Sequence, residues 1–213
     1  MRSILVLNAK GGCGKSTLAT NLASYFAWEE GKQVALADFD PQSSSLAWLK
    51  ARSEQWPVIT GLDGSQGSVR APRDTEVLIL DAPAAVHGKD ITALVRKAET
   101  VLVPVLPSPM DMRAAADFIQ ELLKNGQVSR GDSKLAIIAN RVRENTLIYQ
   151  KLHEFLKKLG IPLVATLRDT QNYVRAAERG VGIFEMAPSA VWQDVEQWQP
   201  LIRYLRSKRS RAA

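Results

Sequence analysis

The sequence has few of the residues that would place it in a membrane, an oxidising compartment or a metal-cluster protein. Its 213 residues include one cysteine, Cys13, and two histidines, His87 and His153. A single thiol excludes an intramolecular disulfide and a cluster held by cysteine pairs, and the histidines have no partner at metal-ligand spacing. No apolar run approaches the roughly 18 residues needed to span a bilayer. We therefore expect a cytoplasmic protein.

The composition instead indicates a folded chain with one core. Hydrophobic residues make up 46% of the sequence, and no low-complexity tract, internal repeat or linker divides it. A chain of this length can bury a sizeable core. We expect a single domain over residues 1–213 that ends in a basic segment from about residue 201.

Strand and helix signals alternate along the chain, which is typical of a doubly wound α/β fold with a mostly parallel sheet and helices on both faces. Strands are expected at residues 3–8, 33–38, 76–81, 100–104 and 134–140, with a shorter one at 163–165. Helices are expected at residues 15–28, 44–53, 90–97, 112–124, 145–159, 171–179 and 189–207. Between Trp56 and Asp74, glycines and prolines break every periodicity, so we expect a loop that holds at most one short strand.

A phosphate-binding loop follows the first expected strand. Glycines let successive main-chain N–H groups point at a polyphosphate, and the helix that follows offers its positive end to the same anion. In such a loop Lys15 reaches the β and γ phosphates, and the Ser16 hydroxyl is a ligand of Mg²⁺. The sequence therefore predicts a nucleotide site, with ATP and Mg²⁺ as cofactors. The predicted nucleotide-binding residues of the loop are Gly11, Gly12, Cys13, Gly14, Lys15, Ser16 and Thr17.

The loop departs from the generic G-x-x-x-x-G-K-[ST] pattern, because Ala9 stands at the first glycine and Lys10 adds a second lysine. In this form it resembles the deviant phosphate loop (deviant Walker A) of the ParA/MinD family of ATPases. Other segments resemble further motifs of the family, in the family's order: 34–42 (VALADFDPQ), 77–83 (VLILDAP), 101–109 (VLVPVLPSP) with Asp111, and 137–141 (IIANR). The resemblance spans roughly residues 2–185. It implies a P-loop fold and slow, partner-stimulated hydrolysis of ATP.

Aspartates follow two expected strands at the sheet edge where nucleotides bind in such folds. Asp38 and Asp81 each end a strand, so we expect both near Mg²⁺, often through water. The resemblance implies that Asp40 orients the attacking water. Alternatively, Asp38 or Asp40 caps the helix expected from residue 44.

The resemblance assigns further roles to residues of the loop and of the strand at 134–140. It implies that Asn140 and Arg141 face the adenine, although Asn140 could equally be a turn residue. It also implies that Lys10 crosses to the ATP of a partner subunit, which makes turnover depend on an ATP-bound homodimer. Cys13 is expected to fill space, with a redox switch as the alternative.

Most of the net positive charge lies near the C-terminus. From Leu201 to Ala213 the chain carries five basic residues and no acid, against a net charge of +6 for the whole chain. Clustered cations neutralise phosphates and release counterions, so the segment predicts sequence-independent DNA binding and association with the nucleoid. A solvated tail without a binding role is the alternative. The candidate DNA contacts are Arg203, Arg206, Lys208 and Arg209, with Arg168, Arg175 and Arg179 as an extension of the patch.

The same segment permits a membrane reading, because Leu201, Ile202 and Leu205 stand among its basic residues, as in an amphipathic helix. MinD-type relatives end in this way. Against this reading, the apolar face is narrow and Pro200 interrupts the approach. Trp192 and Trp198 are expected to be buried in the core.

Within the family, the run at 167–174 (LRDTQNYV) looks most like the small partition ATPases called ParF and like McdA proteins that space carboxysomes. The resemblance implies a positioning ATPase whose cargo is a plasmid, a chromosome or a protein compartment. It also implies a ParB-like or adaptor protein that stimulates hydrolysis. An ATP-dependent ligase similar to dethiobiotin synthetase is the alternative from another class, but it would need an acceptor pocket instead of a basic tail.

Overall fold

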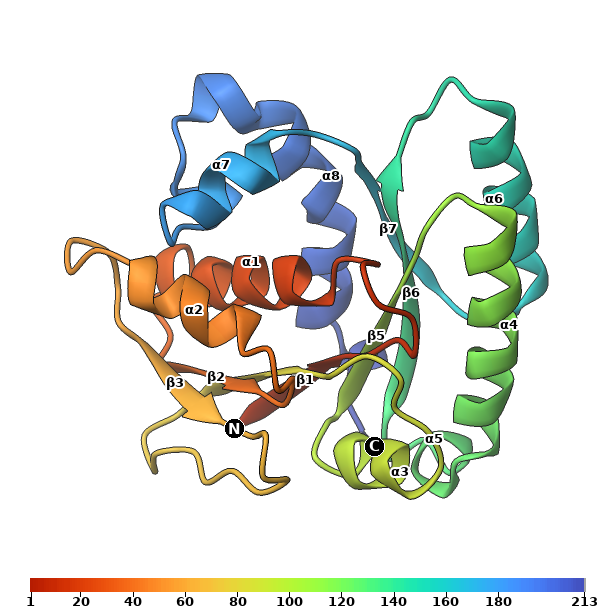
Figure 1. Cartoon of the computed structure of the whole chain (residues 1–213), viewed down its shortest axis with the longest axis horizontal. Coiled ribbons are helices and arrows are strands. Elements are labelled where there is room, and N and C mark those ends of the chain that lie inside the picture. The colour runs from red at the N-terminus through yellow and green to blue at the C-terminus, as the bar shows by residue number, and fades with distance from the viewer. Residues whose placement is uncertain (213) are drawn as a thin grey trace.

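The computed structural model describes residues 1–212 and contains one seven-stranded sheet in which every strand pair is parallel (Figure 1). The strand order is β3-β2-β4-β1-β5-β6-β7, so the connections wind outward in both directions from the centre. The strands are β1 (Arg2–Val6), β2 (Val34–Asp38), β3 (Ile59–Asp63), β4 (Val77–Asp81), β5 (Thr100–Val105), β6 (Lys134–Val142) and β7 (Leu163–Arg168).

Helices cover both faces of the sheet, which confirms the predicted fold class. Helices α1, α7 and α8 share a core with one face, and helices α3, α4 and α6 share a core with the other. The helices are α1 (Lys15–Trp28), α2 (Ser44–Ala51), α3 (Lys89–Val95), α4 (Pro109–Lys124), α5 (Gly126–Ser129), α6 (Leu147–Lys158), α7 (Asn172–Glu178) and α8 (Pro188–Arg206), with 3-10 turns η1 (Ile183–Glu185) and η2 (Lys208–Ser210).

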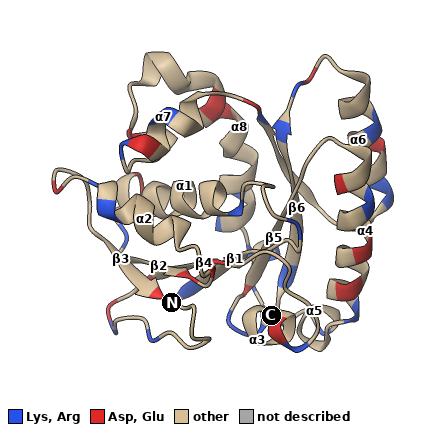
Figure 2. Cartoon of the chain, viewed as in Figure 1, with Lys and Arg blue, Asp and Glu red and all other residues tan. Residues whose placement is uncertain are grey.

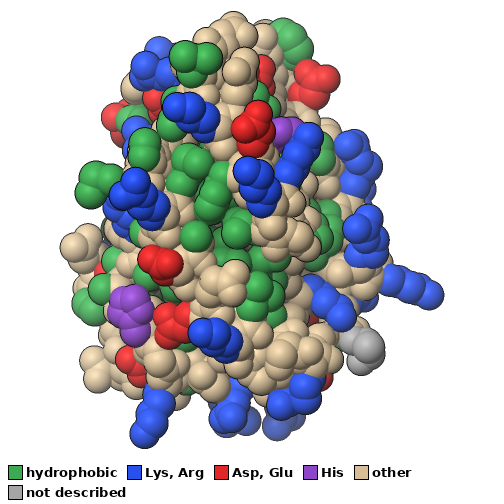
Figure 3. Space-filling view, turned by 90° about the vertical axis from the view of Figure 1, so that its right-hand side faces the viewer, with side chains coloured by type: hydrophobic (Ala, Val, Ile, Leu, Met, Phe, Trp, Pro, Cys, Tyr) green, Lys and Arg blue, Asp and Glu red, His purple; other side chains and the backbone are tan. Residues whose placement is uncertain are grey.

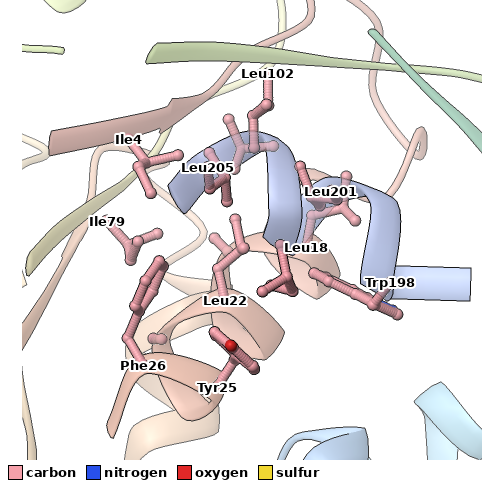
Figure 4. Close-up of a cluster of buried hydrophobic side chains, with 14 of the residues drawn as sticks. Ile4, Leu18, Leu22, Tyr25, Phe26, Ile79, Leu102, Trp198, Leu201 and Leu205 are labelled. Carbon is pink, nitrogen blue, oxygen red and sulfur yellow. The ribbon is translucent and has the colours of Figure 1, made fainter. Parts of the chain in front are cut away.

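The central strand β1 divides its side chains between the two cores. Ile4 and Val6 belong to the core under α1 and α8, whereas Leu5 and Leu7 belong to the core under α3, α4 and α6. Such alternation follows from the period of two in a strand, and burial on both faces explains why β1 is apolar throughout. Figure 4 shows the first core, in which Trp198 of α8 packs beside α1.

Most predicted elements are present, and several of their ends differ for local reasons. Helix α4 begins at Pro109, because Ser108 caps it by accepting a hydrogen bond from the Asp111 N–H and proline suits the first helical position. Thr146 caps α6 in the same way. The segment from Trp56 to Asp74 holds one short strand, β3, at the edge of the sheet.

Two expectations about the C-terminal region are wrong, and both concern helix α8. Pro200 lies inside the helix and does not interrupt it. Because proline has no N–H, the carbonyl oxygen of Glu196, an exposed residue, has no i+4 helical donor. Trp192 was expected in the core but is 59% exposed, because Val191 and Asp194 take the inward face of that turn, while Trp198 is fully buried as predicted.

The apolar residues behind the membrane reading lie in the core. Leu201, Ile202 and Leu205 are 0%, 2% and 3% exposed and pack with α1 and the sheet. These three side chains therefore cannot insert into a bilayer while the domain is folded. Among the described residues, no helix combines the length and apolar character needed to cross a membrane.

A buried ion pair ties α2 to η1. Arg52 contacts Glu185 through two hydrogen bonds, Nη2 to Oε1 at 2.5 Å and Nη1 to Oε2 at 2.9 Å, and the two side chains are 5% and 0% exposed. Arg52 also donates to the carbonyl oxygens of Pro57 and Gly180. Because the guanidinium and the carboxylate satisfy each other, both charges can be buried here.

Candidate nucleotide site

The loop between β1 and α1 is shaped to bind an anion. Gly12 and Gly14 have φ angles of +76° and +92°, which favour glycine. Helix α1 begins at Lys15 with no side-chain cap and no acidic residue in its first turn. Within residues 1–212, no protein acceptor takes a hydrogen bond from the main-chain N–H groups of Gly11, Gly12, Gly14, Ser16 and Thr17. The loop therefore offers free donors and the positive end of a helix dipole.

Asn140 fixes this loop from the side. Its Nδ2 donates to the Cys13 carbonyl oxygen at 2.8 Å, and the residue is buried. A Cβ at Gly14 would lie 2.3 Å from that nitrogen, so glycine is required by contact as well as by φ. Asn140 thus positions the loop, and its predicted contact with adenine stays a prediction.

Lys15 and Cys13 are both held within the loop. Lys15 is 7% exposed, and its Nζ donates to the Lys10 carbonyl oxygen at 3.2 Å. Burial raises the pKa of the Cys13 thiol, although nearby Lys15 opposes this shift. A buried thiol with a raised pKa is poorly reactive, which favours the space-filling role over a redox switch.

Asp38 ends β2 beside Asp81 of β4 but has an evident structural task. Its carboxylate accepts main-chain hydrogen bonds from Asp40 at 3.0 Å, Ser45 at 2.8 Å and Leu46 at 3.2 Å. The last two are donors of the first turn of α2, so Asp38 caps this helix, as the alternative reading of the sequence proposed. A role of Asp38 at the metal, through water, stays a prediction.

Asp81 is better placed to serve a metal. Burial raises its pKa to about 6, although the nearby hydroxyl groups of Ser45 and Ser16 oppose this shift. Its Oδ2 accepts from Ser45 Oγ at 2.5 Å, whereas within the described chain its buried Oδ1 has no hydrogen-bond partner. An orphaned carboxylate oxygen is costly, and the hydration shell of a Mg²⁺ ion held by Ser16 would satisfy it.

The other ligands of such a metal ion would not come from protein carboxylates or histidines. Among the described residues, no three His, Cys, Asp or Glu side chains gather at a spacing that could hold an ion. Mg²⁺ usually keeps several waters and takes phosphate oxygens as ligands. The donor set therefore fits Mg²⁺ bound together with a nucleotide.

Asp40 lies at the rim of the site. It is partly exposed and lines the same cavity as the phosphate loop. Its Oδ1 accepts the Gln42 main-chain N–H at 2.9 Å, which holds the side chain in the turn after β2. Solvent can therefore reach Asp40, and its expected role in orienting the attacking water stays a prediction.

Lys10 points out of its own loop. Its Nζ lies 2.8 Å from Asp111 Oδ1 at the start of α4, and the two side chains are 39% and 13% exposed. Burial opposes ionisation of Asp111, but hydrogen bonds from Lys10 and Ser108 outweigh it and lower the pKa of this carboxyl. The second lysine is thus held by an ion pair within the subunit.

A cavity of about 820 Å³ adjoins the loop and reaches α7. Arg141 lines it in a left-handed conformation, with φ of +53°, and forms an ion pair with Asp169 at 3.4 Å. Several other residues that line the cavity were not among the predicted site residues. These are Gln42, Trp48, Thr170, Gln171, Tyr173 and Val174.

The predicted DNA contacts fall into two separate groups. Arg168 lines the cavity at the carboxyl end of the sheet, near α7. The segment after α8 lies at the amino end, where Ser210 accepts hydrogen bonds from Arg2 and Thr100 at the starts of β1 and β5. The length of the strands therefore separates Arg168 from residues 208–211. A DNA contact by Arg168, Arg175 or Arg179 stays a prediction.

Two of these arginines are engaged in ion pairs inside the chain. Arg168 contacts the buried Asp194 of α8, with Nε to Oδ1 at 2.5 Å, and donates to Gln193 at 2.6 Å. Arg206 contacts Glu30 at 2.8 Å. The structure thus gives Arg168 the task of holding α8 on β7.

Comparison with known proteins agrees with this geometry. Residues 4–183 match the CobQ/CobB/MinD/ParA nucleotide binding domain. The chain is 28% identical over 191 residues to the maintenance of carboxysome distribution protein A of Halothiobacillus neapolitanus, covering 86% of this chain and 87% of that protein. It is 33% identical over 155 residues to the chromosome-partitioning ATPase Soj of Thermus thermophilus, covering 57% of this chain and 61% of Soj.

Solved structures share the fold at low sequence identity. A Cyanothece McdA–ATP complex has a TM-score of 0.69 at 15% identity, covering 94% of this chain and 96% of the other. Cobyrinic acid a,c-diamide synthase of Mycobacterium smegmatis, solved with an ATP analogue and magnesium, has a TM-score of 0.70 at 18% identity, covering 100% and 98%. The chain has a phosphate loop after β1 and an aspartate at the end of both β2 and β4, and the family model matches it over most of its length. The chain belongs to the CobQ/CobB/MinD/ParA family of nucleotide-binding domains.

Proposed function

We propose that this protein is a ParA-type positioning ATPase. ATP would close two subunits into a dimer, the dimer would bind nucleoid DNA without sequence preference, and an adaptor or ParB-like partner would stimulate slow hydrolysis and release. The observation that carries the proposal is the pair of lysines in one loop. Lys15 is buried over the phosphate site, while Lys10 leaves the loop and ends at Asp111.

The Lys10 geometry supports a role in trans. Since the Lys10 ammonium group pairs with Asp111 outside its own phosphate loop, it could serve another site once this ion pair opens. A cation supplied to the γ-phosphate stabilises the charge of phosphoryl transfer. ATP with Mg²⁺ supplies the transferable phosphoryl group, and Asp40 would orient the water that attacks it.

Among the three classes of cargo, a carboxysome-like compartment is the first to test. Two relatives that cover 86% of this chain, from Halothiobacillus neapolitanus and Gloeobacter kilaueensis, are both named maintenance of carboxysome distribution protein A. Soj, named as a chromosome-partitioning ATPase, matches 57% of the chain. A plasmid or chromosome is therefore the second choice.

The test is retention of the purified protein on duplex DNA with ATP, with ADP and without nucleotide, at two salt concentrations. The proposal expects retention that needs ATP and falls with salt. ATP turnover that requires a small carboxylate acceptor and does not respond to DNA would instead favour an ATP-dependent ligase. The cobyrinic acid a,c-diamide synthase described above shares the fold of this chain. Retention on anionic vesicles but not on DNA would favour a MinD-like protein.

A further inference from the structure

Three loops meet at the amino end of the sheet, on the opposite side from the phosphate loop. The loop after α3 is joined to the loop before β6 by Ser133, whose hydroxyl donates to the carbonyl oxygens of Val95 at 3.1 Å and Ala98 at 2.7 Å. The Lys134 N–H donates to the Glu99 carbonyl oxygen at 2.8 Å. These bonds fix residues 95–99 and 130–134 side by side.

The C-terminal segment docks onto the same place. Arg2 donates to the carbonyl and the hydroxyl oxygen of Ser210 at 3.0 and 2.9 Å, and Ser210 is fully buried. Thr100, which also donates to the Ser210 carbonyl, pairs with Lys134 in the sheet. Residues 207–211 therefore lie on the folded domain, next to the start of β6.

The surface that these loops form, called the amino-edge patch below, is strongly basic. Figure 2 shows lysine and arginine positions along the ribbon at this end of the molecule, and Figure 3 shows lysine and arginine side chains at the lower end of one face. Its acids are neutralised, since Glu99 pairs with Arg2 at 2.6 Å and Asp132 with Arg130 at 3.0 Å. The cations of the patch are Arg96, Lys97, Arg130, Lys134, Lys208, Arg209 and Arg211, and within residues 1–212 an ion pair engages Arg130 alone among them.

We propose that the amino-edge patch binds the phosphate backbone of double-stranded DNA, with Arg96, Lys97 and Lys134 as contacts alongside the C-terminal basic residues. The proposal rests on the DNA binding proposed above and identifies the protein surface that makes the contact. Duplex DNA carries one negative charge per roughly 1.7 Å of helix axis, so several unpaired cations on one surface release several counterions. A bilayer would also attract the charges, but Leu201, Ile202 and Leu205 are buried and cannot insert.

The position of the patch explains how ATP would strengthen DNA binding. Strand β5 has 6 residues, and at 3.3 Å per residue about 20 Å of strand separates the amino end from the nucleotide end. Two subunits that close through their nucleotide ends turn their patches outward. The dimer then carries two patches on one particle, and two linked sites can raise apparent affinity about 100-fold or more.

The experiment compares two triple variants in full-length protein. Arg96→Ala/Lys97→Ala/Lys134→Ala removes three charges from the patch, and Lys151→Ala/Lys157→Ala/Lys158→Ala removes three exposed charges from α6. The dissociation constant for a random duplex is measured with ATP over a series of salt concentrations. The slope of the logarithm of the binding constant against the logarithm of the salt concentration is negative. The patch variant should reduce the magnitude of this slope by about 2 to 3, whereas the α6 variant should leave it unchanged.

Each other outcome decides against the assignment. If the wild type binds DNA and the patch variant keeps the wild-type slope and melting temperature, the patch is not the DNA surface, while the proposed function stands. If the wild type does not bind DNA with ATP, the DNA binding given under the proposed function is refuted, and the assignment of its surface is refuted with it. If the wild type binds anionic vesicles and the patch variant loses that binding, the patch serves a membrane.

Discussion

Gly14→Ala should weaken nucleotide binding through a collision with Asn140. Gly14 has a φ of +92°, and an added Cβ would lie 2.3 Å from Asn140 Nδ2, a nitrogen that donates to the Cys13 carbonyl. Gly12 is the matched control, because its φ is +76° but a Cβ there would meet nothing within 4 Å. The two variants share the backbone strain and differ in the contact.

The magnitude follows from two contributions. A left-handed conformation costs a residue with a Cβ about 1–2 kcal/mol. The new Cβ would also displace Asn140, and the loss of the hydrogen bond from Asn140 to the Cys13 carbonyl oxygen would cost about 1 kcal/mol more. If the loop must keep this geometry to hold phosphates, Gly14→Ala should lose about 2–3 kcal/mol of binding, or about 30-fold to 100-fold in affinity. Gly12→Ala should lose only the first contribution, about 1–2 kcal/mol, or about 5-fold to 30-fold in affinity.

The assay is a fluorescent-nucleotide titration of both variants, with Asn140→Ala and the double variant Gly14→Ala/Asn140→Ala completing a cycle. The double variant should lose less than the sum of the single changes, because Asn140→Ala removes the atom that the new Cβ strikes. Equal losses for Gly12→Ala and Gly14→Ala, together with an additive cycle, would refute the role given to Asn140. Thermal unfolding checks that each variant is folded.

Four further predictions concern single residues. Lys15→Ala should raise the dissociation constant for ATP about 30-fold or more, since a charged hydrogen bond is lost, and unchanged binding would remove Lys15 from the site. Asp40→Ala should bind ATP but slow hydrolysis about 100-fold, as measured by phosphate release; a normal rate would place the water elsewhere. Lys10→Ala should bind nucleotide yet elute as a monomer with ATP on size exclusion, and an ATP-dependent dimer would contradict the role in trans. Arg52→Met should lower the free energy of unfolding by about 3–5 kcal/mol in urea, because Glu185 is left as an unpaired buried charge; Arg52→Met/Glu185→Leu should recover much of this loss.

The sequence by itself determined the features that depend on near neighbours along the chain. The glycine spacing in the phosphate loop, the apolar strands and the alternation of strand and helix are local patterns, so they predicted the parallel α/β fold and the family. Local capping also governs the start of α4 at Pro109, although the sequence reading placed that start at Met112. The short strand β3 was foreseen only as a possible exception within a loop, because glycine and proline weaken the strand signal there.

The tertiary structure alone decided which partner each polar side chain takes. Asp38 caps α2, Lys10 pairs with Asp111, and Arg168 holds Asp194. Each of these groups has several possible partners in the sequence, and only the packing of distant segments selects one. Docking of Ser210 against Arg2 likewise moved the C-terminal cations to the amino end of the sheet, away from Arg168. Charge and periodicity can be read along a chain, whereas the competition among distant partners is resolved only when burial fixes which of them meet.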